Sequence, residues 1–117
     1  MENKDLVRLE HMLDSARAIQ AYIKGKRRGS LDTNRMLISS IIRELEIIGE
    51  AAAKVTKETQ NQFSELPWKN IIGMRNQLIH VYFDINNDIV WKTIKEALPL
   101  LCTQLEHIIT NFKQRKG

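Results

Sequence analysis

The polar residues best suited to chemistry in this chain lie close together, between positions 75 and 82. They are Arg75, Asn76, His80 and Tyr82. A histidine whose pKa lies near neutrality can take a proton from a ribose 2′-hydroxyl or give one to a departing 5′-oxygen. An arginine can hold a phosphate through paired hydrogen bonds and stabilise the charge that grows in the transition state. These residue types therefore suit RNA cleavage without a metal ion.

The spacing of these residues limits how they can meet. Asn76 and His80 are four residues apart and share one face of a helix, whereas Arg75 and His80 are five apart and diverge by about 140°. Either the helix ends before His80 and the chain turns it back, or a second chain brings the two groups together; the alternatives are compatible. Transesterification needs a proton acceptor and a proton donor, and a dimer would supply a second His and Arg. Asn76 could orient His80 or a phosphate oxygen, and Tyr82 could donate to phosphate or stack on a base.

The same four residues also have an ordinary structural interpretation. Residue types alone favour this interpretation over a catalytic one. An Arg and a His near a helix end often bind its last carbonyl groups or pair with a glutamate, and Tyr82 would then be a half-buried anchor. Glu46 and Glu50 are candidates to reach Arg75 or His80 from the preceding helix. Three other residues are expected to have no chemical role. His11 and His107 are expected on the surface or with their hydrogen bonds satisfied, and Cys102 is expected as an inert thiol in an apolar stretch.

Length and composition narrow the class of protein. The 117 residues suit one domain, 1–117, and 18 Lys and Arg against 14 Asp and Glu leave a net charge of +4. A single Cys excludes an internal disulfide and cysteine-clustered zinc. The glycine-rich phosphate loop, HExxH and GxSxG are missing, and the three His residues lie far apart, so no metal or cofactor is expected. Without a long apolar run or a charged-then-apolar leader, the expectation is a soluble, cytoplasmic protein with no membrane partner.

Apolar residues recur at three-to-four spacing in four segments, 5–24, 33–58, 67–79 and 88–113, which predicts four amphipathic helices. Ser30 or Asp32 is expected to cap the second helix and Ser64 the third. Pro99 falls inside the fourth pattern, so a kink or local break is expected near Lys95. The prediction is an all-α, antiparallel up-and-down bundle of four or five helices.

Two further surfaces bear on binding partners. Apolar residues cover more than half the circumference of the helix over 33–58, so one face is expected in the protomer and another against a partner chain. Gly49 and the alanines at 51–53 would allow close approach there. The basic turn at 24–30 has two glycines and four cations; a solvated loop is favoured over an RNA groove.

Residues 67–83, PWKNIIGMRNQLIHVYF, closely resemble the signature of HEPN-domain proteins of the HepT type. These are ribonuclease toxins of bacterial and archaeal toxin–antitoxin pairs. The family motif is Arg, four residues beginning with a polar one, His, any residue, and Tyr, which Arg75, Asn76, His80 and Tyr82 match in order and spacing. The stretches 43–52 and 88–91 also resemble the family, and the likeness covers about residues 4 to 112.

The resemblance implies a HEPN-like helical bundle that forms a homodimer, with the two motifs meeting at a cleft. It implies a metal-independent endoribonuclease that leaves a 2′,3′-cyclic phosphate and a 5′-hydroxyl, with Arg75 and His80 catalytic and Asn76 supporting them. In such type VII systems an MntA-like nucleotidyltransferase antitoxin transfers AMP from ATP onto the motif tyrosine, here Tyr82. The alternative from another class is a non-catalytic helical subunit that binds a nucleotidyltransferase.

Overall fold

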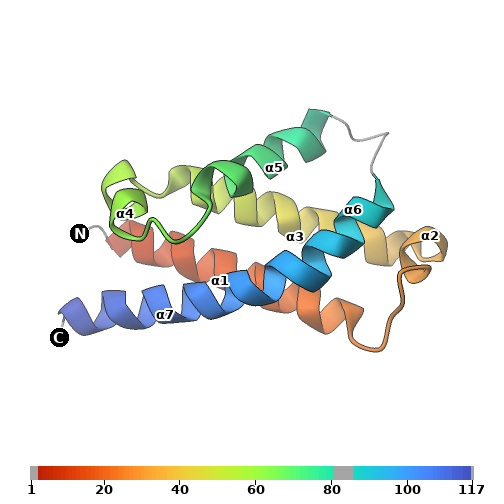
Figure 1. Cartoon of the computed structure of the whole chain (residues 1–117), viewed down its shortest axis with the longest axis horizontal. Coiled ribbons are helices and arrows are strands. Elements are labelled where there is room, and N and C mark those ends of the chain that lie inside the picture. The colour runs from red at the N-terminus through yellow and green to blue at the C-terminus, as the bar shows by residue number, and fades with distance from the viewer. Residues whose placement is uncertain (1–2, 81–85, 117) are drawn as a thin grey trace.

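A computed structural model describes the backbone of residues 3–80 and 86–116 and the side chains of residues 4–74 and 86–114. Its long helices are α1 (Asn3–Ile23), α3 (Arg35–Lys54), α5 (Trp68–His80) and α7 (Leu98–Lys116), and its short ones are α2 (Ser30–Thr33), α4 (Lys57–Gln62) and α6 (Asn87–Lys92). The described backbone contains no strand. Successive long segments run in opposite directions (Figure 1), which confirms the predicted all-α, up-and-down bundle.

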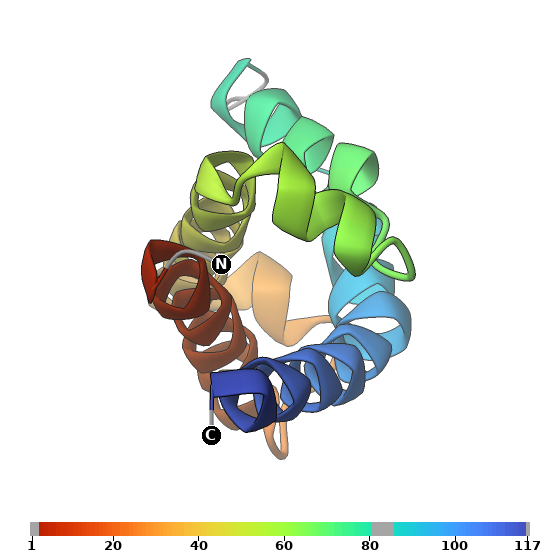
Figure 2. The ribbon, with the colours of Figure 1, turned by 90° about the vertical axis from the view of Figure 1, so that its left-hand side faces the viewer.

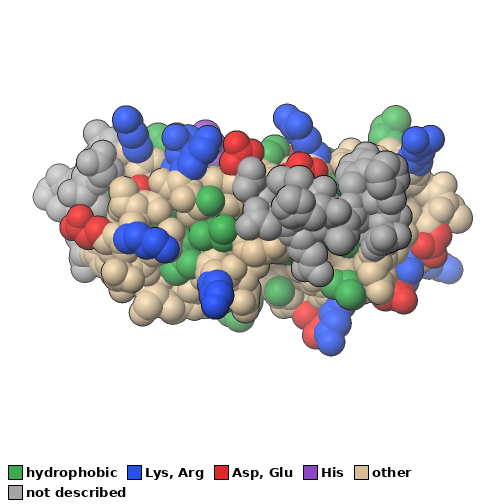
Figure 3. Space-filling view, turned by 90° about the horizontal axis from the view of Figure 1, so that it is seen from above, with side chains coloured by type: hydrophobic (Ala, Val, Ile, Leu, Met, Phe, Trp, Pro, Cys, Tyr) green, Lys and Arg blue, Asp and Glu red, His purple; other side chains and the backbone are tan. Residues whose placement is uncertain are grey.

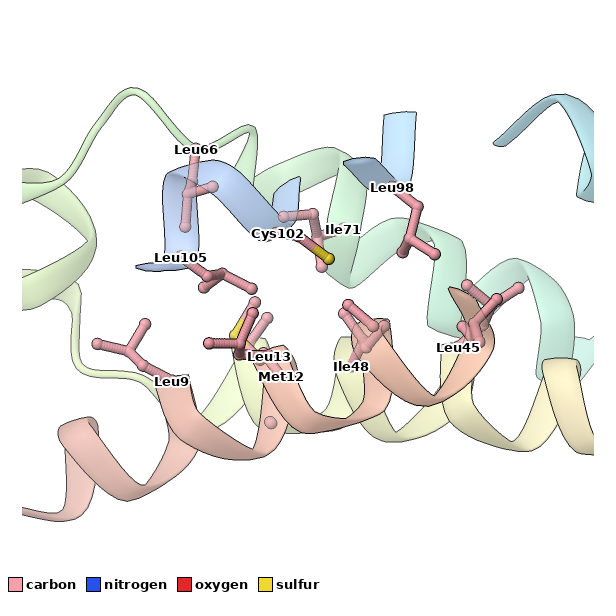
Figure 4. Close-up of a cluster of buried hydrophobic side chains, with 14 of the residues drawn as sticks. Leu9, Met12, Leu13, Leu45, Ile48, Leu66, Ile71, Leu98, Cys102 and Leu105 are labelled. Atoms are coloured by element: carbon pink, nitrogen blue, oxygen red, sulfur yellow. The ribbon is translucent and has the colours of Figure 1, made fainter. Parts of the chain in front are cut away.

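The helices enclose one apolar core. α1 packs against α3 on one side and α7 on the other, and α5 packs against α3 (Figure 2). Leu9, Met12 and Leu13 of α1 form one apolar cluster with Leu45 and Ile48 of α3 and with side chains of α5 and α7 (Figure 4). Each fully buried aliphatic side chain of this kind stabilises the fold by roughly 1.5–3 kcal/mol relative to exposure. The core thus holds α5 onto the bundle.

The broad apolar surface of α3 is used largely inside the protomer. Its buried residues are Leu37, Ile41, Ile42, Leu45, Ile48, Gly49, Ala51 and Ala52. They fill the space between α1 and α5, the two helices that flank α3. Ala53 is exposed and Ile47 is half-buried. The width of the apolar face, from which a partner-facing surface was expected, is therefore explained by packing within one chain.

The predicted helix over 33–58 is interrupted, and this boundary prediction was wrong. α3 ends at Lys54, and Thr56 caps a new helix, α4, by accepting a hydrogen bond from the backbone N–H of Thr59 (3.3 Å). Asp5 of α1 accepts hydrogen bonds from the N–H and hydroxyl of Thr56, at 3.1 and 2.6 Å. The contact across 51 residues holds Thr56 in extended backbone, which a helix cannot accommodate.

The caps and breaks elsewhere follow local chemistry. Asn34, rather than Ser30 or Asp32, caps α3, because its Oδ1 accepts from the Leu37 N–H at 3.0 Å. Pro99 has no N–H to bond the Lys95 carbonyl, and the chain widens into a π-helical turn, η2 (Thr93–Ala97), where the break was predicted. None of the helices in the described part of the chain is long and apolar enough to cross a membrane.

Candidate active site

α5 carries three of the four motif positions and is fixed to the core at its beginning. Trp68 is buried, and its Nε1–H donates to the Phe63 carbonyl at 3.0 Å. Pro67 directly precedes the helix, and its carbonyl accepts the first intrahelical bond, from Ile71 (3.0 Å); Ser64, the predicted cap, is exposed. Ile71 is buried one turn further on and belongs to the same apolar cluster as Cys102 of α7 (Figure 4). The start of α5 is thereby fixed to the end of α4 and to the apolar core.

The backbone of α5 stays helical through His80. The alternative in which the helix ends before His80 is therefore wrong. Because the helix is continuous, positions 75 and 80 lie about 140° apart around its axis, and positions 76 and 80 lie about 40° apart. Position 75 continues the stripe of the buried Ile71, four residues earlier. The side chains of Arg75, Asn76 and His80, and all of Tyr82, lie outside the described residues.

The C-terminal end of α5 lies at the edge of the bundle, away from α1 and α7, in both side and end views (Figures 1 and 2). In the view from above (Figure 3), Lys and Arg side chains alternate with Asp and Glu side chains on this face of the bundle. Gly73, two residues before Arg75, is exposed, and a Cβ at this position would meet nothing within 4 Å. The helix thus presents its motif half at the periphery.

Polar contacts fix the start of α6, which follows the motif in the chain. Asn86 caps α6 by accepting from the N–H groups of Asp88 and Ile89, at 2.9 and 3.2 Å. Arg28 bridges two carboxylates, with Nη1 donating to Asp32 at 2.9 Å and Nε to Asp88 at 2.6 Å. Hydrogen bonds to these two carboxylates raise the pKa of Arg28. The motif segment is thus anchored both before and after.

Comparison with known proteins gives this geometry its context. A family model described as "Ribonuclease HepT-like" matches residues 12–108. A "putative RNase" of Caldanaerobacter subterraneus subsp. tengcongensis is 38% identical over 105 residues, which cover 90% of this chain and 94% of that protein. A "probable ribonuclease HepT" of Thermococcus cleftensis is 39% identical over 69 residues, 59% of this chain and 63% of that protein.

The chain belongs to the HepT-like ribonuclease family. The matched residues include all of α5 and α6, so the anchored motif segment lies within the family region. This membership confirms the family prediction and supports endoribonuclease activity. No solved structure matches the chain.

Other candidate residues of this HepT-like ribonuclease lie on α1, α3 and α7. Glu50 pairs with Lys54 at 3.6 Å and lines a small groove beside Arg8 and His11 of α1, so it does not fit the role proposed for it. His11 and His107 are exposed, as expected. Glu46 is half-buried. Among the side chains that the structure describes, no group of three His, Cys, Asp or Glu residues could hold a metal ion.

Sequence reasoning did not find the Arg28 bridge, whereas it correctly placed Cys102 in an apolar stretch. The Arg28–Asp32 ion pair has the four-residue spacing of one helical turn and could have been inferred from the sequence. The Arg28–Asp88 pair joins residues 60 apart and could not. Cys102 is buried, and its Sγ lies 3.5 Å from the side-chain oxygen of Gln20. Burial, with the nearby Glu106 carboxylate, raises the pKa of this thiol, so it is poorly ionised and suits an inert core position.

Proposed function

We propose that this HepT-like ribonuclease is the toxin of a type VII toxin–antitoxin system and cleaves RNA by transesterification without a metal ion. A 2′-oxygen attacks the adjacent phosphorus, the bond to the 5′-oxygen breaks, and a 2′,3′-cyclic phosphate and a 5′-hydroxyl result. One His80 accepts the 2′-hydroxyl proton, and another donates a proton to the departing 5′-oxygen. Arg75 binds the phosphate and stabilises its charge, and Asn76 supports His80.

The observation that carries this proposal is the continuous helix through His80. With positions 75 and 80 about 140° apart on one helix, a single copy of α5 is poorly arranged to direct both groups at one phosphate. A homodimer in which two α5 ends meet would supply Arg75 from one copy and His80 from the other, together with the second histidine that the chemistry needs. The peripheral end of α5 favours such a meeting (Figure 1).

Regulation in this proposal acts on the same segment. A cognate MntA-like nucleotidyltransferase transfers AMP from ATP onto the Tyr82 hydroxyl, and pyrophosphate leaves. The adduct is bulky and anionic and stands two residues from His80, so it would block the cleft and repel RNA phosphates. Residues 1–117 form one HEPN domain that acts in the cytoplasm. RNA is the substrate, and the antitoxin is the protein partner.

The test is RNA cleavage by the purified, unmodified chain in EDTA, with product ends analysed. We expect cleavage with 2′,3′-cyclic phosphate ends, and a loss of at least about a hundredfold in His80→Ala and in Arg75→Ala. His107→Ala is the matched control, because His107 is exposed on α7. Activity that survives in His80→Ala would overturn the assigned role. Absence of cleavage by every form, with tight binding of a nucleotidyltransferase, would favour the non-catalytic subunit.

A further inference from the structure

The basic turn after α1 is joined by a cation from a distant part of the chain. Gly25, at φ +74°, ends α1 and turns the chain. Lys24 and Lys26, on either side of it, line a pocket of about 370 Å³ together with Lys95 of η2. The sequence separates Lys95 from this turn by about seventy residues, so only the fold brings the three lysines to one pocket.

The pocket combines cationic and apolar lining residues, as suits an anion that also carries apolar groups. Its other lining residues are Gln20, Ile23, Gly25, Ile94 and Pro99, and none of the described lining residues is acidic. Within the described side chains, none of its three lysines forms an ion pair. Arg28 in the same turn differs, because Asp32 and Asp88 bind it.

A larger groove provides the contrast. It measures about 550 Å³ and lies between α1 and α7, with both cations and carboxylates in its lining. Arg17 pairs with Glu106 at 2.7 Å, and Lys113 pairs with Glu10 at 3.5 Å. Arg17 and Lys113 of this groove are therefore both paired, and an anion would have to displace a carboxylate. The smaller lysine pocket presents positive charge without that competition.

The position of the lysine pocket relates it to the motif. Lys95 lies eight residues after Asn87 in the helical segment formed by α6, η2 and α7, which follows the motif in the chain. The separation is about 12 Å along this segment. The Lys95 ammonium group lies 5.6 Å from the centre of the Trp91 ring on the same segment. A single strand that leaves the end of α5 and continues along this segment would reach the lysine pocket.

We propose that Lys24, Lys26 and Lys95 bind backbone phosphates of the RNA substrate outside the cleavage point, while Ile23, Ile94 and Pro99 contact its sugars or bases. This inference rests on the proposed ribonuclease function. The surface recognises charge and not sequence, because ammonium groups contact phosphates and carry no base-specific pattern. It sets substrate affinity and the salt dependence of binding, and it takes no part in the chemical step.

The test measures binding of a single-stranded, fully 2′-O-methylated RNA, which lacks the attacking hydroxyl and cannot be cleaved by this route. Its Kd is measured by fluorescence anisotropy across a salt series for wild type and for the variant K24Q/K26Q/K95Q. An exposed charge pair contributes up to about a fivefold change in Kd, so the triple variant should bind about 10- to 100-fold more weakly. The slope of log Kd against log salt should fall by about 2, since each phosphate contact in single strands contributes about 0.7.

The matched control is K4Q/K54Q/K57Q, which removes the same charge from exposed lysines around the other end of α1. Lys4 and Lys24 are twenty residues apart, about 30 Å along a helix. The variant K24R/K26R/K95R should keep wild-type affinity, because it keeps the three positive charges. Far-UV circular dichroism checks that every variant folds. The backbone amide resonance of Gly25 should shift on RNA addition in the wild type, which locates the contact.

The outcomes separate this inference from the proposed function. Cleavage of ordinary RNA by wild type, with equal Kd values for the two glutamine triples, would overturn the lysine surface and leave the nuclease intact. Weakened binding in K24Q/K26Q/K95Q alone, without cleavage by wild type, would support the surface and count against the nuclease. Competition by AMP or inorganic phosphate as effective as that by RNA would show a free-anion pocket and overturn the RNA assignment.

Discussion

Asp5 joins the start of α1 to the start of α4, and its replacement should weaken the whole bundle. The side chain is 1% exposed, and its carboxylate accepts from the Thr56 N–H (3.1 Å), the Thr56 hydroxyl (2.6 Å) and the Thr59 hydroxyl (2.5 Å). A hydrogen bond to a charged group contributes about 1.5–3 kcal/mol, and an amide replaces only part of the set. We expect Asp5→Asn to lower the free energy of unfolding by about 1–2 kcal/mol and Asp5→Ala by about 3–4 kcal/mol.

The assay is urea unfolding followed by far-UV circular dichroism at pH 7. Asp14→Asn is the matched control, because Asp14 is an exposed carboxylate on the same helix. Its effect should stay within about 0.5 kcal/mol. A loss of more than about 1 kcal/mol is a large fraction of the stability of a domain of this size, so the comparison is decisive. Equal stability of the two asparagine variants would refute the role given to Asp5.

The pH dependence of the Asp5 effect has a definite sign. Burial raises the pKa of this carboxyl, but the hydrogen bonds from Thr56 and Thr59 outweigh it, and the pKa falls below its usual value of 3.8. A lowered pKa in the folded state means that the unfolded chain takes up the proton first as the pH falls. The contribution is therefore complete above pH 3.8 and is lost as the pH falls through the folded-state pKa. A difference between wild type and Asp5→Asn that persists undiminished in acid would contradict this account.

Two further predictions concern the turn after α1 and the anchor of α5. Gly25→Ala should lower the free energy of unfolding by about 1–2 kcal/mol, because an L side chain is strained at φ +74°. Gly29→Ala is the control and should be nearly neutral, because Gly29 has φ −63°. Equal effects of the two substitutions would contradict the strain assigned to position 25. Trp68→Phe should cost about 2–3 kcal/mol, from the lost bond to the Phe63 carbonyl and the smaller ring. Trp91→Phe, at a half-buried site, should cost less in the same urea unfolding assay.

Much of the fold was predictable because its causes are local. The stripes at three-to-four spacing located all four long helical segments, and Gly25 ended the first one where expected. Pro99 removed a backbone donor, and the π-helical turn appeared within the preceding turn. The candidate active site was predictable in the same way as far as α5, since Arg75, Asn76 and His80 fall on a helix whose start is apolar.

What the tertiary structure alone decided depends on contacts between residues far apart in the chain. Local propensity continued the second helix to position 58, but hydrogen bonds from Thr56 to Asp5 compensate the broken helical ladder and set the break. The apolar circumference of α3 was visible in the sequence, but whether α5 or a second chain covered it was a question of packing. Lys95 lines the same pocket as Lys24 and Lys26 only because the bundle places η2 beside the end of α1. Periodicity and caps act within a few residues and can be inferred from sequence, whereas these contacts exist only once the helices pack.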